Sequence, residues 1–144
     1  MAELLLALAV LAIMTAVAIP VFSSVNEQWA LETAAWRLVS DLRLAQQIAV
    51  TGGIDTRIDF RWAANDYRMF LPFEKSMVKL PSGVSYALNN FPVTGGVHKL
   101  SFTTLGAPSR GGTVGFKTRN GSRIYVIITP ATARIRVSPT PPDP

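Results

Sequence analysis

The sequence contains no cysteine and a single histidine, His98. Disulfide frameworks, thiol nucleophiles and the usual zinc sites built from cysteine and histidine are therefore excluded. Charged side chains are also scarce, at 16% of the 144 residues, and no basic residue precedes Arg37. The length allows one modest domain and excludes two full-sized domains. We expect no metal and no cofactor.

Apolar residues are concentrated near the amino terminus. Leu4–Phe22 are 19 consecutive positions in which only Thr15 and Pro20 are not strongly apolar. A bilayer core about 30 Å thick takes about 20 helical residues, so this run predicts one transmembrane helix. A cleaved signal peptide is the alternative, because residues 16–18 have the A-x-A form of a cleavage site. Residues 1–3 nevertheless lack the basic region that such a signal requires.

The charges divide between the two ends of the chain. Residues 1–53 carry 2 basic and 4 acidic side chains, whereas residues 54–144 carry 12 basic and 5 acidic ones. The carboxy-terminal part is therefore a basic body that follows an almost neutral stalk. Glu3 stands at the start of the apolar run. It either lies at the water interface of a monomeric anchor or pairs with the amino terminus of a neighbouring copy.

Residues 3–13 read E-L-L-L-A-L-A-V-L-A-I, and Pro20 follows Glu3 by 17 positions. Both features resemble the start of type IV pilins and type II secretion pseudopilins. The resemblance implies that Glu3 neutralises the α-amino group of the next subunit in a filament. It also implies that Pro20 bends or locally melts the helix so that subunits can pack.

The front of the chain departs from this pattern. In the family a short basic leader ending in glycine precedes the apolar run, and the first mature residue would fall two positions before Met1. We expect either a start codon assigned too late or a missing leader. The positive-inside rule therefore gives no orientation, because the charges that set it belong to that leader.

A second apolar pattern continues beyond Ser23. Spacings of 4, 3, 4, 3 and 4 predict one stripe on a helix that ends near Gly52-Gly53; its members are Leu31, Ala35, Leu38, Leu42, Ala45 and Ala49. The stripe covers fewer than three heptads, so packing on the chain's own domain is favoured over a coiled coil. Trp29 and Trp36 lie beside it, as core anchors or at a membrane or subunit boundary.

After residue 54 the helical pattern gives way to short runs typical of β-strands. Eight strands are predicted: 56–61, 67–71, 78–80, 84–88, 99–104, 113–118, 123–129 and 133–137. Asn65-Asp66 and Asn120-Gly121 predict hairpin turns. Eight short strands in some ninety residues indicate a small antiparallel sandwich or two packed sheets.

The order of these segments resembles the GspH/FimT branch of minor pseudopilins. The end of the helix, L-x-x-x-L-x-x-A-Q-Q-x-A from Leu38, matches that branch except that Gln46 replaces its usual arginine. The runs L-P-S-G-V from Leu80 and A-R-I-R-V from Ala133 follow in the order of the same branch. The resemblance covers nearly the whole chain apart from the proline-rich end.

Catalytic motifs are weak throughout. Gly106–Thr113 has the outline of a phosphate loop, but glycine stands where the lysine is required, so a strand connection is the better interpretation. Asn120 is a formal glycosylation acceptor whose sequence is explained by its turn. Without a second histidine or a cysteine, His98 is interpreted as a solvated side chain at a strand edge. We do not expect an enzyme.

Two aspartates and two arginines alternate along the first predicted strand: Asp55, Arg57, Asp59 and Arg61. Because residues two apart share a face of a strand, this pattern indicates an ion-paired surface more than an acid–base pair.

Basic residues near the carboxy terminus are the remaining functional signal. Arg134 and Arg136 alternate on one face of the last predicted strand, and Arg119 and Arg123 surround the preceding hairpin. FimT-like members involved in DNA uptake carry a G-R-x-R element here, and residues 133–136 resemble it with alanine in place of glycine. These four arginines are candidate DNA contacts. The alternative is that they only provide the charged outer face that a sandwich needs.

The prediction is an α+β pilin fold in which a long hydrophobic helix packs on a small antiparallel β-sandwich-like domain. Its expected parts are a transmembrane and assembly helix (1–23), an amphipathic continuation (24–53), a β-rich domain (54–138) and a proline-rich tail (139–144). The resemblance implies a minor pseudopilin or minor pilin, anchored in the bacterial cytoplasmic membrane with its β-rich domain outside the cytoplasm. Its partners would be other pilins or pseudopilins and the inner-membrane assembly platform. The alternatives are a DNA-binding minor pilin and an unrelated signal-anchored extracytoplasmic domain.

Overall fold

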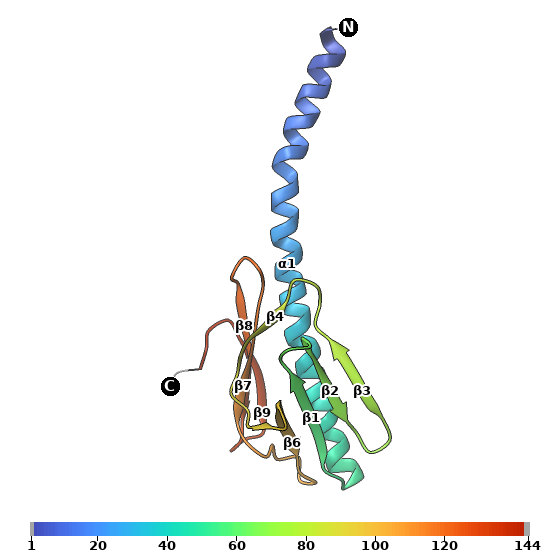
Figure 1. Ribbon diagram of the computed structural model, residues 1–144, viewed down its shortest axis with the longest axis vertical. Helices are drawn as coiled ribbons and strands as arrows, with labels where there is room; N and C mark the ends of the chain where they lie inside the picture. Colours follow the sequence, from blue (N-terminus) through green and yellow to red (C-terminus); the bar gives the residue numbers. More distant parts are fainter. Residues whose placement is uncertain (1, 143–144) are drawn as a thin grey trace.

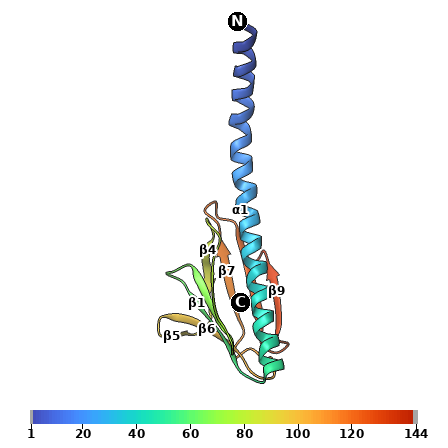
Figure 2. The ribbon, with the colours of Figure 1, turned by 90° about the vertical axis from the view of Figure 1, so that its right-hand side faces the viewer.

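The structure, a computed structural model, describes residues 2–142, with side chains described for residues 2–15 and 25–142. Within these residues the chain forms one helix, α1 (Ala2–Gly52), followed by nine β-strands. The amino-terminal half of α1 projects away from the strands, and its carboxy-terminal half lies along them (Figures 1 and 2). A helix packed on antiparallel sheets confirms the predicted α+β class.

The carboxy-terminal half of α1 is held by its apolar stripe. All six stripe residues from Leu31 to Ala49 are at most 1% exposed, which confirms the prediction that they pack on the chain's own domain. The helix ends at Gly52, and Gly53 has a φ of 60°. Glycine adopts this left-handed conformation without the steric cost that a side chain would add.

The strands form two antiparallel sheets, with the orders β3-β2-β1-β6-β5 and β4-β7-β8-β9. Their bounds are β1 (Thr56–Arg61), β2 (Asp66–Phe70), β3 (Lys75–Lys79), β4 (Ser85–Asn89), β5 (Val93–Thr94), β6 (Val97–Phe102), β7 (Gly112–Lys117), β8 (Arg123–Thr129) and β9 (Arg134–Ser138). The strands β1 and β8 have the predicted bounds, and the other predicted strands are displaced by one to three residues.

The strand β5 was not predicted. Its two residues pair with the start of β6, and the turn between them is Gly95-Gly96, in which both residues have positive φ. The predicted turns are present: Asn65 has a φ of 53° between β1 and β2, and Gly121 has a φ of 91° between β7 and β8. Residues 106–111 connect β6 to β7, as expected for the segment with the outline of a phosphate loop.

The core lies where the two sheets and α1 meet. Phe60 of β1 stacks on Phe91 at 5.8 Å between ring centroids, and Tyr86 of β4 contacts Phe116 of β7 at 5.5 Å. All four residues are at most 3% exposed. The two sheets, which together we call the β-body (residues 56–138), therefore share one hydrophobic core with the second half of α1.

Over the described residues, no helix is sufficiently long and apolar to cross a membrane. The predicted span Leu4–Phe22 includes residues 16–22, whose side chains lie outside the described ones.

Candidate functional site

The amino-terminal half of α1 presents apolar side chains outward. Eight large ones between residues 4 and 14 are at least 50% exposed: Leu4, Leu5, Leu6, Leu8, Val10, Leu11, Ile13 and Met14. Glu3 is exposed in the first turn of the helix. Apolar surface of this extent is typical of interaction sites. The side chain of Pro20, the other predicted assembly residue, lies outside the described ones.

Trp29 and Trp36 also project from α1. They are 67% and 57% exposed, so the interpretation as core anchors is wrong. Seven residues separate them, which places both on one side of the helix. A boundary with a partner or a membrane is therefore the remaining interpretation.

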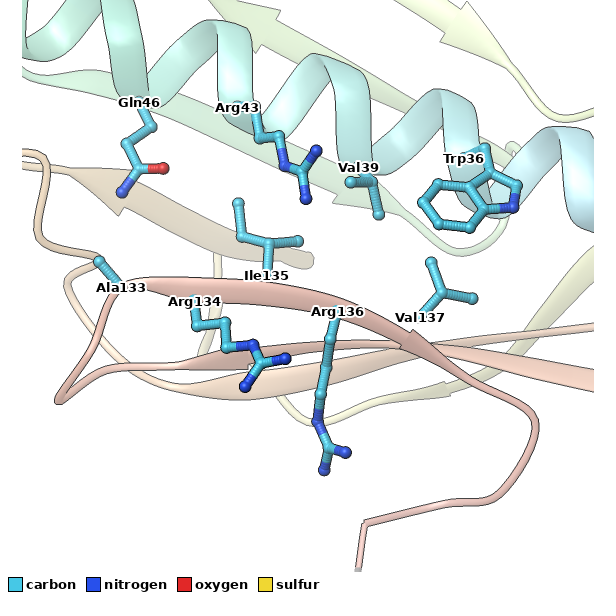
Figure 3. A pocket seen from close by; sticks show the side chains of 9 residues that line it. All are labelled: Trp36, Val39, Arg43, Gln46, Ala133, Arg134, Ile135, Arg136 and Val137. Atoms are coloured by element: carbon cyan, nitrogen blue, oxygen red, sulfur yellow. The ribbon is translucent and has the colours of Figure 1, made fainter.

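A groove runs between α1 and β9, and we call it the α1–β9 groove (Figure 3). It has a volume of about 490 Å³ and is lined by Trp36, Val39, Arg43, Gln46 and residues 133–137. A second hollow of about 370 Å³ shares Trp36, Val39 and Arg43 and extends along the helix to Gln47. The second hollow therefore adjoins the groove on the surface of α1.

Successive side chains of β9 point to opposite faces of the strand, and this alternation determines which of them face α1. Ile135 is 6% exposed and points toward α1 with Val137, whereas Arg134 and Arg136 point away from the helix (Figure 3). Arg43 extends from α1 toward β9 (Figure 3). The turn before β9 ends at Ala133, whose φ of 49° is a conformation that favours glycine. Alanine therefore occupies the glycine position of the G-R-x-R element under strain.

The four predicted basic residues do not form one cluster. Arg136 pairs with Ile127 on β8, and Arg134 pairs with Thr129. Arg123 is four residues along β8 from Ile127, which is about 13 Å of strand. Arg119 lies in the hairpin beyond it. The structure therefore brings together Arg134 and Arg136 and leaves Arg123 and Arg119 at the other end of β8.

Gln46, which replaces the arginine of the resembled branch, makes a specific contact. Its side-chain nitrogen donates to the carbonyl oxygen of Gly106 at 2.8 Å. A Cβ on Gly106 would lie 2.8 Å from Val50, and this residue has a φ of 76°. Glycine at this position thus allows the β6–β7 connection to approach the end of α1.

A polar contact also joins α1 to the first sheet. The Tyr67 hydroxyl donates to Asp41 at 2.5 Å, and Arg37 contacts the same carboxylate oxygen at 3.2 Å. Burial, together with the hydrogen bond to Asp41, raises the pKa of Tyr67 above its ordinary value of 10.0. Tyr67 is thus a neutral donor that stabilises the buried carboxylate. Sequence reasoning missed this pair, because the two residues are 26 positions apart.

In the described part of the chain, no group of three or more histidine, aspartate or glutamate residues could hold a metal. His98 is half-buried, and not fully solvated as the sequence had suggested. It lies within β6, which pairs with both β1 and β5, and its Nδ1 is 2.8 Å from the carbonyl oxygen of Phe91.

The alternating charges of β1 make ion pairs, but the expected surface face is only partly exposed, because Asp59 is 8% exposed and Asp66 of β2 is 2% exposed. Arg57 contacts Asp59 at 3.0 Å, and Arg61 forms a charge-assisted bond with Asp66, which also raises the pKa of Arg61. Asp55 accepts a hydrogen bond from the backbone nitrogen of Thr104 at 3.1 Å instead.

A long helix, half of it outside a body of two antiparallel sheets, defines the class of pilin-like proteins. The family model described as Type II transport protein GspH matches residues 34–139. The chain belongs to this family. No curated protein matches the chain significantly.

Two solved structures have the same fold. The chain is similar to the minor pseudopilin EpsH from the Type 2 Secretion System of Vibrio cholerae, with 12% identity and a TM-score of 0.57, covering 75% of this chain and 95% of EpsH. It is also similar to the type IV minor pilin FimU of Pseudomonas aeruginosa, with 18% identity and a TM-score of 0.60. That match covers 81% of this chain and 92% of FimU.

Proposed function

We propose that this chain is a minor pseudopilin or minor pilin subunit of a type II secretion or type IV pilus-like filament, and that it assembles through its amino-terminal helix. The observation that supports this proposal is the difference in exposure along α1. Apolar residues near its start are at least 50% exposed, whereas the stripe from Leu31 onward is at most 1% exposed. A helix that leaves so much apolar surface outside its own body needs a second apolar environment.

Two environments would cover this surface in turn. Residues 1–23 would lie in the cytoplasmic membrane before assembly, with residues 54–138 outside the cytoplasm, and would pack against neighbouring subunits afterwards. Residues 24–53 would join the two parts, and residues 139–144 would form a tail. Other pilins or pseudopilins and the inner-membrane assembly platform would be the partners.

Glu3 would guide docking in this scheme. A carboxylate that enters an apolar filament core is costly unless it meets a cation, and the α-amino group of the next subunit provides one. Pro20 would allow the helix to bend there, because proline lacks the N–H that the helical ladder uses.

Replacement of Glu3 tests this proposal. The full chain would be produced in cells that carry the filament machinery, and its amount in sheared filaments would be compared with its amount in membranes. We expect Glu3→Gln to lower incorporation at least tenfold and to leave the membrane pool intact, because loss of one partner of a buried charge pair costs about 2–5 kcal/mol. Glu32→Gln is the matched control, since Glu32 is also exposed on α1. Equal incorporation of Glu3→Gln and the parent chain would contradict the proposal.

DNA binding is the second candidate function, and it rests on Arg134 and Arg136. Both side chains project outward from the same face of β9 (Figure 3). The full chain should bind duplex DNA with an affinity that falls with salt. The double variant Arg134→Ala/Arg136→Ala should lower the slope of log affinity against log salt by about two. Arg68→Ala/Lys75→Ala, two exposed cations of the other sheet, is the control. An unchanged slope would remove this candidate.

A further inference from the structure

The outer edge of β9 is unpaired within the described residues, because β9 is the last strand in the order β4-β7-β8-β9. In an antiparallel ladder, alternate residues of an edge strand direct their N–H and C=O groups away from the neighbouring strand. Such an edge can accept another strand. The other edge of this sheet differs, since a bulge interrupts the pairing of β4 between Tyr86 and Leu88.

The α1–β9 groove lies beside this edge and has the length of a short strand. From Trp36 to Gln46, the two ends of its helical side, the helix rises about 15 Å, at about 1.5 Å per residue. The five residues of β9 extend over about 16 Å, at about 3.3 Å per residue. An extended segment of about five residues would therefore have β9 on one side and the helix above it along its whole length.

The residues that line the groove indicate which side chains a bound segment should carry. Three arginines line it, Arg43, Arg134 and Arg136, and it has no acidic lining residue. Among the described residues, none of the three takes part in an ion pair. Two apolar residues of α1 also line the groove: Trp36, which is exposed, and Val39, which is 2% exposed.

We propose that the α1–β9 groove binds an extended acidic segment of a partner protein, which adds to β9 as a fifth strand of the second sheet. Side chains on one face of the added strand would contact Trp36 and Arg43. Carboxylates on its other face would pair with Arg134 and Arg136. The backbone ladder would provide affinity, and the arginines would provide the preference for acidic partners. The inference deepens the proposed assembly function by giving the chemistry of one partner contact.

The test uses the full chain in detergent and a fluorescent seven-residue peptide that alternates glutamate and valine and is blocked at both ends. Fluorescence anisotropy should show saturable binding, and the matching lysine–valine peptide should bind at least tenfold more weakly. The variant Arg43→Glu/Arg134→Glu should bind the acidic peptide at least tenfold more weakly. Arg68→Glu/Lys75→Glu makes the same change of charge on the other sheet and should bind as the parent does.

Two N-methylated peptides distinguish an added strand from simple charge attraction. In an extended chain, N-methylation of the valines blocks one edge, and N-methylation of the glutamates blocks the other. We expect one of the two peptides to bind as the parent peptide does and the other to lose binding. Equal binding of both would overturn the proposal.

Two further results would also overturn it. The first is that the acidic peptide shows no saturable binding at millimolar concentration. The second is that Arg43→Glu/Arg134→Glu loses DNA binding while neither it nor the parent chain binds the peptide. Peptide binding is measured on the isolated chain and filament incorporation in cells, so either proposal can fail without the other.

Discussion

The two halves of α1 are built from similar apolar residues and have opposite surroundings. Leu8 in the first half is 54% exposed, whereas Leu38 in the second half is fully buried. Helices in proteins gain most of their stability from packing rather than from propensity. The second half is therefore part of the β-body's core. The first half contributes little to the stability of that core, and its apolar surface is available for partners.

The strongest way to break this comparison is to shorten one leucine in each half. Leu38→Ala should lower the free energy of unfolding of the β-body by about 3 kcal/mol, because it removes buried methyl groups and leaves a cavity. Leu8→Ala should change it by less than about 0.5 kcal/mol. Urea unfolding of the full chain in detergent, followed by near-ultraviolet circular dichroism, measures both. A similar loss in the two variants would show that the halves are not independent.

The polar contact between α1 and β2 sharpens the comparison, because it belongs to the second half alone. Tyr67→Phe removes the donor to Asp41 and should lower the free energy of unfolding by about 2 kcal/mol, as for other hydrogen bonds to charged groups. The same urea titration measures it, and Tyr125→Phe serves as the control. An unchanged midpoint for Tyr67→Phe would mean that Arg37 alone satisfies Asp41.

Alkaline pH should release the second half of α1 from the sheets. Burial raises the folded-state pKa of both Tyr67 and Tyr86 above 10.0, the ordinary value. The contribution of these two tyrosines to the free energy of unfolding is therefore fully present below about pH 10. It is lost as the pH rises toward the folded-state pKa values, by at most about 1.4 kcal/mol per pH unit for each tyrosine.

Absorbance of tyrosinate against pH, beside near-ultraviolet circular dichroism, measures this effect. Tyr67 and Tyr86 should ionise only together with loss of tertiary signal. Ionisation of these two tyrosines near pH 10 in the folded protein would contradict the prediction. In Tyr67→Phe, one tyrosine fewer should ionise in this late step.

The smallest expected effect concerns the strand that borders the groove. Ala133→Gly removes a side chain from a left-handed conformation, which costs about 1–2 kcal/mol for residues other than glycine. The greater freedom of glycine in the unfolded chain offsets about 0.4–1 kcal/mol of this gain. We expect a net stabilisation of about 0.5 kcal/mol, measured by thermal unfolding. A destabilised variant would show that the methyl group of Ala133 is needed for packing.

Sequence patterns predicted the elements of the fold well, because apolar residues occupy the positions of each element that become buried. The stripe from Leu31 to Ala49 followed from its spacing, and the strands β1 and β8 followed from β-like runs bounded by turn residues. The strand β5 did not, since two residues between turns carry no period. The role of Gln46 was also hidden, because its partner Gly106 is 60 positions away.

The candidate site was predicted only in part. The alternation of Arg134 and Arg136 on one face of a strand follows from the period of two in β-strands. The groove does not, because it needs Trp36 and Arg43 of the helix to lie beside the last strand of a sheet. The strand order that places β9 there depends on long-range pairing, which local patterns do not specify.

The alignment of α1 with the sheets has a mechanical consequence. The strands run roughly parallel to the axis of α1 (Figures 1 and 2). The buried stripe lies between the helix and the sheets. A pull on the free end of the helix along its axis therefore loads the stripe and the Tyr67–Asp41 bond in shear. Contacts loaded in shear share the force, whereas contacts that are peeled break one after another. The same packing that forms the core thus lets the β-body withstand tension transmitted through a single helix.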